Sequence, residues 1–378
     1  MNNGYTVRVR VAFTVATVAA VAAIMSIFSA ARRRKQRQSC SGSCYLHSEQ
    51  KQQSAFKRVL ADNSYTPFKH LSNNQLEGYK DESGISCFPA ENASNSHPFE
   101  AEITALLKTP QPEIEFGTEI VDFKMKNSYV WVHTETQLKE LVDVLSEERF
   151  FAVDTEQHSL RSYLGFTALV QISTREKDYL VDTIALHDFM GILRPVFANP
   201  SICKVFHGAD NDIIWLQRDF HIYVVNLFDT SKACEVLSKP QKSLAYLLET
   251  YCGVTTNKLL QREDWRQRPL SEEMLHYART DAHFLLYIAN CMINELKQLD
   301  NESSCSGDKF HFALEASKRS NMICLQLFTK EIEAYPGESS ALSLFSRQVS
   351  SHGCPSISNE TQNIVRQLCA WRDLMFAN

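Results

Sequence analysis

Two acidic residues follow an apolar segment at a spacing that suits metal binding. Residues 150–153 are Phe-Phe-Ala-Val, a run that predicts a buried strand, and Asp154 and Glu156 come directly after it. Residues two apart along a strand point to the same face of a sheet. We therefore expect one face to present two carboxylates at the end of this strand.

Two further segments contribute acids of the same kind. The segment His-Gly-Ala-Asp-Asn-Asp at 207–212 follows another apolar run and contains Asp210 and Asp212. Tyr277 and Asp281 are four residues apart in a long helical pattern, so their side chains are expected one turn apart on the same side of a helix. A strand, a turn and a helix thus each offer a carboxylate.

Carboxylates gathered in one place repel one another unless cations neutralise them. Carboxylate oxygens are hard ligands that suit Mg²⁺ or Mn²⁺. Two such ions about 4 Å apart activate a water and stabilise a departing oxygen in phosphodiester cleavage. We therefore interpret the chain as a metal-dependent nuclease.

Each segment also has an ordinary structural explanation when it is taken alone. The first pair of acids suits a turn or a helix cap after a strand, and the Tyr and Asp of the third segment suit a hydrogen-bonded pair on a wet helix face. His207 and Trp215 are interpreted as core residues, Trp215 because of its helical spacing. Arg266 and Arg268, next to Trp265, suit either phosphate contact or solvated surface charge.

Length and composition allow one core with appendages, since the chain has 378 residues, of which 44% are hydrophobic. The formal net charge is −5, but residues 1–48 hold seven Lys or Arg and no acid, which leaves −12 for the rest. A protein whose main part is this acidic needs a local basic patch, metal ions or a partner to attract nucleic acid. The 11 cysteines lack paired zinc-type spacing, which favours a reducing compartment.

The N-terminal segment predicts a membrane anchor. Residues 11–31 carry no charge, and as a helix they would rise about 31 Å, enough to cross a bilayer. Five cations lie at 32–37 against Arg8 and Arg10 before the segment, so the positive-inside rule places the C-terminal part in the cytoplasm. The alternatives are an organelle transit peptide, a cleaved signal peptide, and a basic run that serves nuclear import.

The three acidic segments, in this order and spacing, resemble the Asp-Glu-Asp-Asp exonucleases that carry a tyrosine in the third motif. Within that superfamily the chain is similar to RNase D and, more closely, to the catalytic 3′-to-5′ exoribonuclease associated with the eukaryotic RNA exosome. The similarity covers about residues 97 to 375. The motifs that carry it lie at 152–158, 161–166, 205–209, 212–220, 227–230, 243–248, 264–266 and 277–281.

The resemblance implies an RNase H-like sheet and two divalent ions, Mg²⁺ or Mn²⁺. In the second motif the acid before Ile213 is the family's ligand, so Asp212 is preferred to Asp210, which is expected to cap the following helix. Tyr277 would orient the attacking water. Carried over position by position, the resemblance assigns metal binding to four acids, namely Asp154, Glu156, Asp212 and Asp281.

The same resemblance implies that nucleotides are removed one at a time from a free 3′ end of single-stranded RNA as nucleoside 5′-monophosphates, in RNA processing or decay. An exosome core or other RNA-decay proteins are the implied partners. One alternative is a catalytically weak, membrane-tethered RNA-binding scaffold, against which the intact carboxylates argue. The other is a 3′-5′ DNA exonuclease, because the same metal site serves both sugars.

Four regions are expected along the chain. Residues 1–37 form the basic and hydrophobic N-terminal segment, and 38–96 form a flexible linker rich in Ser, Asn, Gln and Lys. Residues 97–300 form the 3′-5′ exonuclease domain with its N-terminal lead-in, in which strand and helix patterns alternate and predict an α/β fold with a mixed sheet flanked by helices. Residues 301–378 form a helical extension.

The helical extension is expected to end in the truncated start of a further module. The exosome-type enzymes follow the exonuclease domain with a helicase-and-RNase-D C-terminal module, and residues 368–374 resemble its opening helix. The hydrophobic N-terminal segment is a second departure, because the family members are typically nuclear and lack one.

Overall fold

The structure is a computed structural model that describes residues 52–71 except 63 and 65, 97–108, 125, 128–303 except 160, 161 and 163, 311–330, 336–352 and 358–377. The predicted anchor at 11–31 lies outside the described residues. None of the helices within the described ranges combines the length and the apolar character that crossing a bilayer requires.

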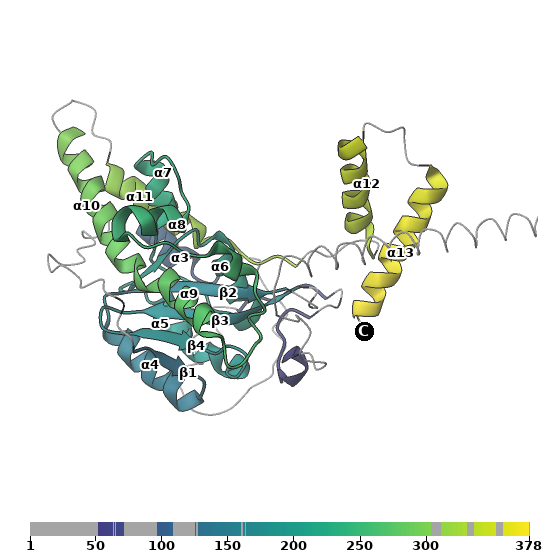
Figure 1. Ribbon diagram of the computed structural model, residues 1–378, viewed down its shortest axis with the longest axis horizontal. Helices are drawn as coiled ribbons and strands as arrows, with labels where there is room; N and C mark the ends of the chain where they lie inside the picture. The colour runs from purple at the N-terminus through teal and green to yellow at the C-terminus, as the bar shows by residue number, and fades with distance from the viewer. Residues whose placement is uncertain are drawn as a thin grey trace, which may run out of the picture. The chain divides into compact units, whose positions relative to one another are not determined.

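A six-stranded mixed sheet forms the centre of the domain, with strand order β1-β4-β3-β2-β5-β6 (Figure 1). The pairs β4–β3 and β3–β2 are antiparallel, whereas β1–β4, β2–β5 and β5–β6 are parallel. This confirms the predicted α/β fold with a mixed sheet. The strands are β1 (Val130–Val132), β2 (Phe150–His158), β3 (Phe166–Ser173), β4 (Asp178–Val181), β5 (Cys203–Phe206) and β6 (Leu227–Asp229).

Helices cover both faces of this sheet (Figure 1). One face packs on α4, η3, α5 and α6, and the other packs on α7, α8, α9 and α10. The helical segments are η1 (Gln52–Ala55), α3 (Glu100–Lys108), α4 (Glu135–Glu147), η3 (His187–Leu193), α5 (Arg194–Ala198), α6 (Asp210–Phe220), α7 (Thr230–Val236), α8 (Leu244–Leu247), η4 (Leu248–Cys252), η5 (Lys258–Arg262), α9 (Glu272–His283), α10 (Leu285–Ser303), α11 (Phe312–Ile323), α12 (Glu338–His352) and α13 (Asn359–Ala377).

Part of the predicted linker packs on the domain. The ring of Phe56 stacks on His187 with centroids 3.8 Å apart. His70 places one ring nitrogen 2.9 Å from the Tyr223 hydroxyl and the other 2.9 Å from the Phe328 carbonyl. Residues 52–71 therefore belong with the domain in the structure, because isolated aromatic residues in this polar segment find apolar and hydrogen-bonding partners there.

The helices α12 and α13 pack against each other as a pair. Gly337 makes this possible, since a Cβ there would lie 2.3 Å from the Cys369 backbone. Arg366 forms an ion pair with Glu338 at 3.2 Å. Both helices fall within the helical extension expected at 301–378.

The core contains one lysine that no carboxylate neutralises in the described contacts. Lys204 on β5 is fully buried, and its Nζ donates to the Asn199 and Ile202 carbonyls at 2.7 and 2.6 Å. Burial lowers its pKa to about 7. Folding therefore favours the neutral amine, which costs free energy at every pH below the ordinary lysine pKa.

Lys204→Met is expected to raise the free energy of unfolding at pH 6 by about 1–3 kcal/mol, because an apolar chain of similar length replaces a desolvated amine. The lysine stabilises less as pH falls from its ordinary pKa towards 7, so the advantage of methionine is largest below pH 7 and shrinks as pH rises to 10. Urea denaturation at pH 6 and 9 measures it. A destabilised variant at both pH values would contradict this account.

Candidate active site: carboxylates from β2, α6 and α9

The alternation of side chains along β2 decides which face receives the first two acids. Phe151 and Val153 point into the core beneath α4 and α6, whereas Phe150 and Ala152 point into the core beneath α10. Asp154 and Glu156 continue this second set and lie on the face that α9 covers. The acids share one strand face as expected, but they do not mark the end of the strand, because β2 continues to His158.

The helix α9 brings a tyrosine and an acid to the same place. Ser271 begins the helix by accepting a hydrogen bond from the Met274 N–H. Tyr277 and Asp281 are both buried, and the Tyr277 hydroxyl donates to the Asp281 carboxylate. The two side chains therefore lie one turn apart on one side of the helix, as the spacing predicts.

A buried ion-pair cluster fixes α9 on the sheet. Asp178 on β4 accepts from Arg279 Nη2 at 2.9 Å and lies 2.8 Å from His283 Nδ1. Ser173 donates a further hydrogen bond to Asp178 at 2.9 Å. Because Arg279 and His283 flank Asp281 on the helix, this cluster sets the position from which Asp281 reaches the site.

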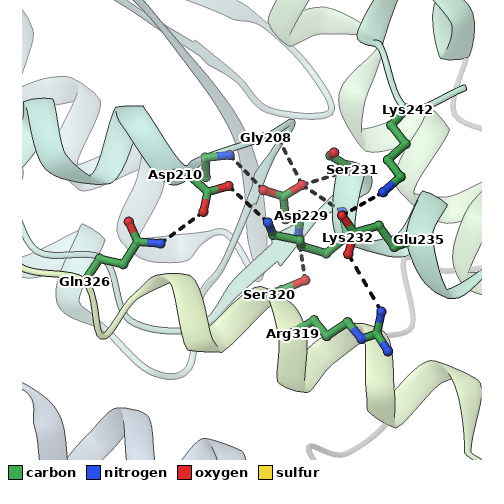
Figure 2. A network of polar contacts seen from close by, with 11 residues as sticks. Gly208, Asp210, Asp229, Ser231, Lys232, Glu235, Lys242, Arg319, Ser320 and Gln326 are labelled. Atoms are coloured by element: carbon green, nitrogen blue, oxygen red, sulfur yellow. Dashed lines mark hydrogen bonds and ion pairs between the residues drawn. The ribbon is translucent and has the colours of Figure 1, made fainter. Parts of the chain in front are cut away.

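The turn before α6 is held by Asp229, at the end of β6 (Figure 2). Its Oδ1 accepts from the Gly208 N–H at 3.0 Å and its Oδ2 accepts from the Ala209 N–H at 2.8 Å. The same carboxylate caps α7 by accepting from the Ser231 and Lys232 N–H groups. One buried side chain thus ties the start of α6 to the start of α7.

Asp212 and Asp210 have different surroundings. Asp212 is 7% exposed, and the Thr155 hydroxyl donates to its carboxylate, which links α6 to β2. Asp210 is partly exposed and accepts from Lys232 Nζ at 3.1 Å and from Gln326 Nε2 at 3.0 Å (Figure 2). The expected capping role of Asp210 is wrong, because Ala209 is the N-cap residue and Asp210 is already inside the helix.

The four predicted acids and the tyrosine line one cavity of about 270 Å³. Carboxylate oxygens of Asp154, Glu156 and Asp281 lie within 4.8 Å of one another. Asp212 lines the same cavity without belonging to that closest group. The remaining polar or aromatic lining includes His207, Asn211, Trp215, Ser243, Lys258 and Gln261.

Burial and mutual repulsion make these carboxyl groups hard to ionise. Burial raises the pKa of Asp212 and of Asp281 to about 7. Burial, followed by repulsion from neighbouring acids, raises the pKa of Asp154 and of Glu156 well above the usual range. Hard oxygen donors that repel one another fit a divalent cation, which would stabilise their ionised forms.

Several expectations about the surroundings were wrong. Trp215 and His207 are partly buried and line the cavity rather than the core. Arg266 and Arg268 neither contact the cavity nor remain as solvated charges. Arg266 pairs with Asp264 at 2.8 Å, and Arg268 pairs with Asp182 at 2.8 Å.

Residues to which the sequence assigned no role at the site also line the cavity. Ser243 caps α8, and Lys258 and Gln261 lie on η5. Ser243 is the first residue of the motif at 243–248, which carries part of the resemblance. No periodicity of the sequence indicated that η5 lies at the cavity. A short segment between helices gives no pattern from which its contacts follow.

Asp229→Ser is expected to weaken catalysis without removing the cap of α7, because serine is a good N-cap residue but is too short to reach Gly208 and Ala209. The start of α6 would then shift Asp212. We expect kcat/KM to fall by about tenfold or more and the Mg²⁺ concentration for half-maximal activity to rise.

Asp229→Asn provides the graded control. An amide oxygen keeps the bonds to Oδ1 and loses only the bond from Ala209, so its effect should be smaller than that of serine. Activity measured across Mg²⁺ concentrations separates this positioning effect from lost stability. An unchanged Mg²⁺ dependence in both variants would show that Asp229 serves stability alone.

Comparisons with known proteins agree with this geometry. A family model described as 3′-5′ exonuclease matches residues 129–297. The chain is 63% identical over 371 residues to Protein RRP6-like 3 of Arabidopsis thaliana, which covers 97% of this chain and 41% of that protein. It is 37% identical over 340 residues to the Exosome complex exonuclease RRP6 of Saccharomyces cerevisiae, which covers 86% and 44%.

The fold also matches a solved structure. The catalytic core of RRP6 from Trypanosoma brucei is 33% identical and superposes with a TM-score of 0.67, covering 86% of this chain and 83% of that one. The chain spans less than half the length of the two curated relatives. The matched residues include the whole carboxylate cavity, and the chain belongs to the RRP6-like 3′-5′ exonuclease family.

Proposed function

We propose that this protein hydrolyses single-stranded RNA from its 3′ end and releases nucleoside 5′-monophosphates. The observation that carries the proposal is the convergence of Asp154, Glu156 and Asp281, with Asp212 beside them, in one cavity. Water adds across the terminal phosphodiester, so the phosphate stays with the released nucleotide and the shortened strand keeps a 3′-hydroxyl.

The chain's own residues have separate tasks in this reaction. The four carboxylates would hold two divalent ions, Mg²⁺ or Mn²⁺, which supply an activated water and neutralise charge on the departing oxygen. Tyr277 donates to Asp281 and so presents its hydroxyl oxygen as an acceptor that orients the attacking water. Lys258 is placed to attract phosphate, and the Trp215 ring to contact the terminal base.

The choice of RNA over DNA rests on the relatives. The yeast relative is named as an exonuclease of the exosome complex. The cavity chemistry serves either sugar, so comparing the digestion of RNA and DNA tests this choice. We further propose that the protein acts with an exosome core or other RNA-decay proteins, which copurification from its source would test.

The full chain should shorten 3′-labelled single-stranded RNA in Mg²⁺ or Mn²⁺ and leave single-stranded DNA much less affected. Chelation or Asp154→Ala should abolish the reaction. Faster digestion of DNA would identify a DNA exonuclease. Binding of RNA without digestion under any metal condition would identify a scaffold protein and reject the proposed activity.

We also propose that residues 11–31 anchor the protein in a membrane with the exonuclease domain in the cytoplasm. The uncharged run and the five cations after it support this orientation. The similarity to the Arabidopsis relative covers 97% of the chain, so it extends into this segment. Resistance of the tagged protein to carbonate extraction tests the anchor, and release into the supernatant would favour a transit peptide or a nuclear location.

A further inference from the structure

The segment η5 forms one rim of the carboxylate cavity. Its five residues run from Lys258 to Arg262 as a 3-10 helix, in which residues three apart lie on the same face. Lys258 and Gln261 have this spacing, and both line the cavity. Leu259 and Arg262 have the same spacing and therefore share the adjacent face.

That adjacent face is open to solvent. Leu259 is 72% exposed, more than any other large hydrophobic side chain in the described part of the chain, and Arg262 is exposed too. An apolar side chain and a guanidinium on one face match the two parts of a nucleotide, since the first contacts a ribose or a base and the second pairs with phosphate.

The rim is firmly held at both ends. The Asn257 side chain accepts a hydrogen bond from the Leu259 N–H at 3.1 Å and begins the helix. After the helix, Trp265 is fully buried, and Asp264 lies 3.4 Å from His158 Nδ1 at the end of β2. The rim is thereby fixed relative to the strand that carries Asp154 and Glu156.

The cavity lining itself offers little positive charge to an RNA strand. Four carboxylates line the cavity, and among its described lining residues Lys258 is the only Lys or Arg. A strand that enters the cavity carries a further phosphate for each upstream nucleotide. Arg262 is the next cation along η5, and its side chain is exposed and does not line the cavity.

We propose that Arg262 binds the first phosphate upstream of the scissile one. Leu259 contacts the nucleoside on the 5′ side of that phosphate. This inference rests on the proposed function, because it assumes that a 3′ end occupies the cavity. It assigns a binding position for the strand outside the cavity, which a dinucleotide with a free 5′-hydroxyl does not reach.

Arg262→Ala is therefore expected to lower kcat/KM about five- to tenfold for a trinucleotide and to leave it unchanged for the dinucleotide. Arg262→Lys should recover part of the loss, since it keeps the charge without the planar guanidinium. For longer RNA, the slope of log kcat/KM against log salt should become shallower by about 0.7, the value for one phosphate contact on a single strand. Lys139→Ala, on α4 and paired with Glu135, is the control for loss of a surface cation.

Binding provides a measurement that does not require hydrolysis. Titration calorimetry with the trinucleotide would compare Asp212→Asn with the double variant that also carries Arg262→Ala, and the double variant should bind five- to tenfold more weakly. If the unmodified chain hydrolyses no RNA but this difference in binding is found, the proposed function is rejected and the inference is retained. Equal losses for dinucleotide and trinucleotide, or no loss for either, would overturn the inference while the nuclease activity stood.

Discussion

Asp212→Asn should lower kcat/KM for single-stranded RNA by about 10²–10³-fold or more, whereas Asp210→Asn should leave it within about threefold. Asparagine keeps the shape of aspartate and still accepts the Thr155 hydrogen bond, but it removes the charge that a divalent cation requires. Asp210 points instead to Lys232 and Gln326, outside the cavity. Its exposed ion pair contributes little to stability.

The two variants form a matched pair, because both remove one charge from the first turn of α6. Any general effect of charge on the helix dipole is therefore the same in both. Single-turnover digestion of 3′-labelled RNA at saturating Mg²⁺ measures the difference. Similar losses in the two variants would show that charge near this helix end matters and that Asp212 has no special role as a ligand.

The position of the acids that line the cavity could be predicted from the sequence because simple geometry places each of them. The spacing of two for Asp154 and Glu156 defines a strand face, and the spacing of four for Tyr277 and Asp281 defines a helix face. Which faces meet depends on the sheet order, which the resemblance supplied. The choice of Asp212 over Asp210 also came from the resemblance, since both acids lie at the same helix start.

Other features depend on tertiary contacts that leave no periodic signal. The long helical pattern that contains Tyr277 and Asp281 belongs to two helices, α9 and α10, which meet at Phe284, where no Gly or Pro marks the break and the phenylalanine is buried in the core. Residues 187–198 form a 3-10 helix followed by α5, whose second residue is Pro195. The proline was a visible signal for this boundary.

The aromatic and basic side chains at the cavity were missed for a related reason. Trp215 has the helical spacing of a core residue, but the first two turns of α6 lie beside the open cavity, so the ring is only partly covered. Lys258 lies in a segment of irregular hydrophobicity. Its relation to the carboxylates exists only because Trp265 and Asp264 hold the following residues against β2.

The second large effect expected is that divalent cations stabilise the folded protein strongly at pH 8 and weakly at pH 5.5. The carboxyl groups of Asp212 and Asp281 have pKa values near 4 when unfolded, and burial raises them to about 7 in the fold. An acid whose pKa is raised in the fold makes its full contribution to the free energy of unfolding below pH 4. This contribution is lost as pH rises through 7, because the buried carboxyl then has to ionise. Above pH 7 the metal-free cavity therefore holds repelling charges, and a bound cation removes that cost.

Thermal unfolding with and without 10 mM Mg²⁺ measures this linkage. A cation at about 100 times its dissociation constant adds about 2.7 kcal/mol, which corresponds to a rise in Tm of about 5–10 °C at pH 8 and about 2 °C or less at pH 5.5. Buried histidines such as His97 and His221, whose pKa values are lowered by burial, also change stability with pH. These histidines act equally with and without Mg²⁺, so the difference in Tm between the two conditions isolates the carboxylates. An equal rise in Tm at both pH values, or the same rise in Asp212→Asn, would place the cation elsewhere.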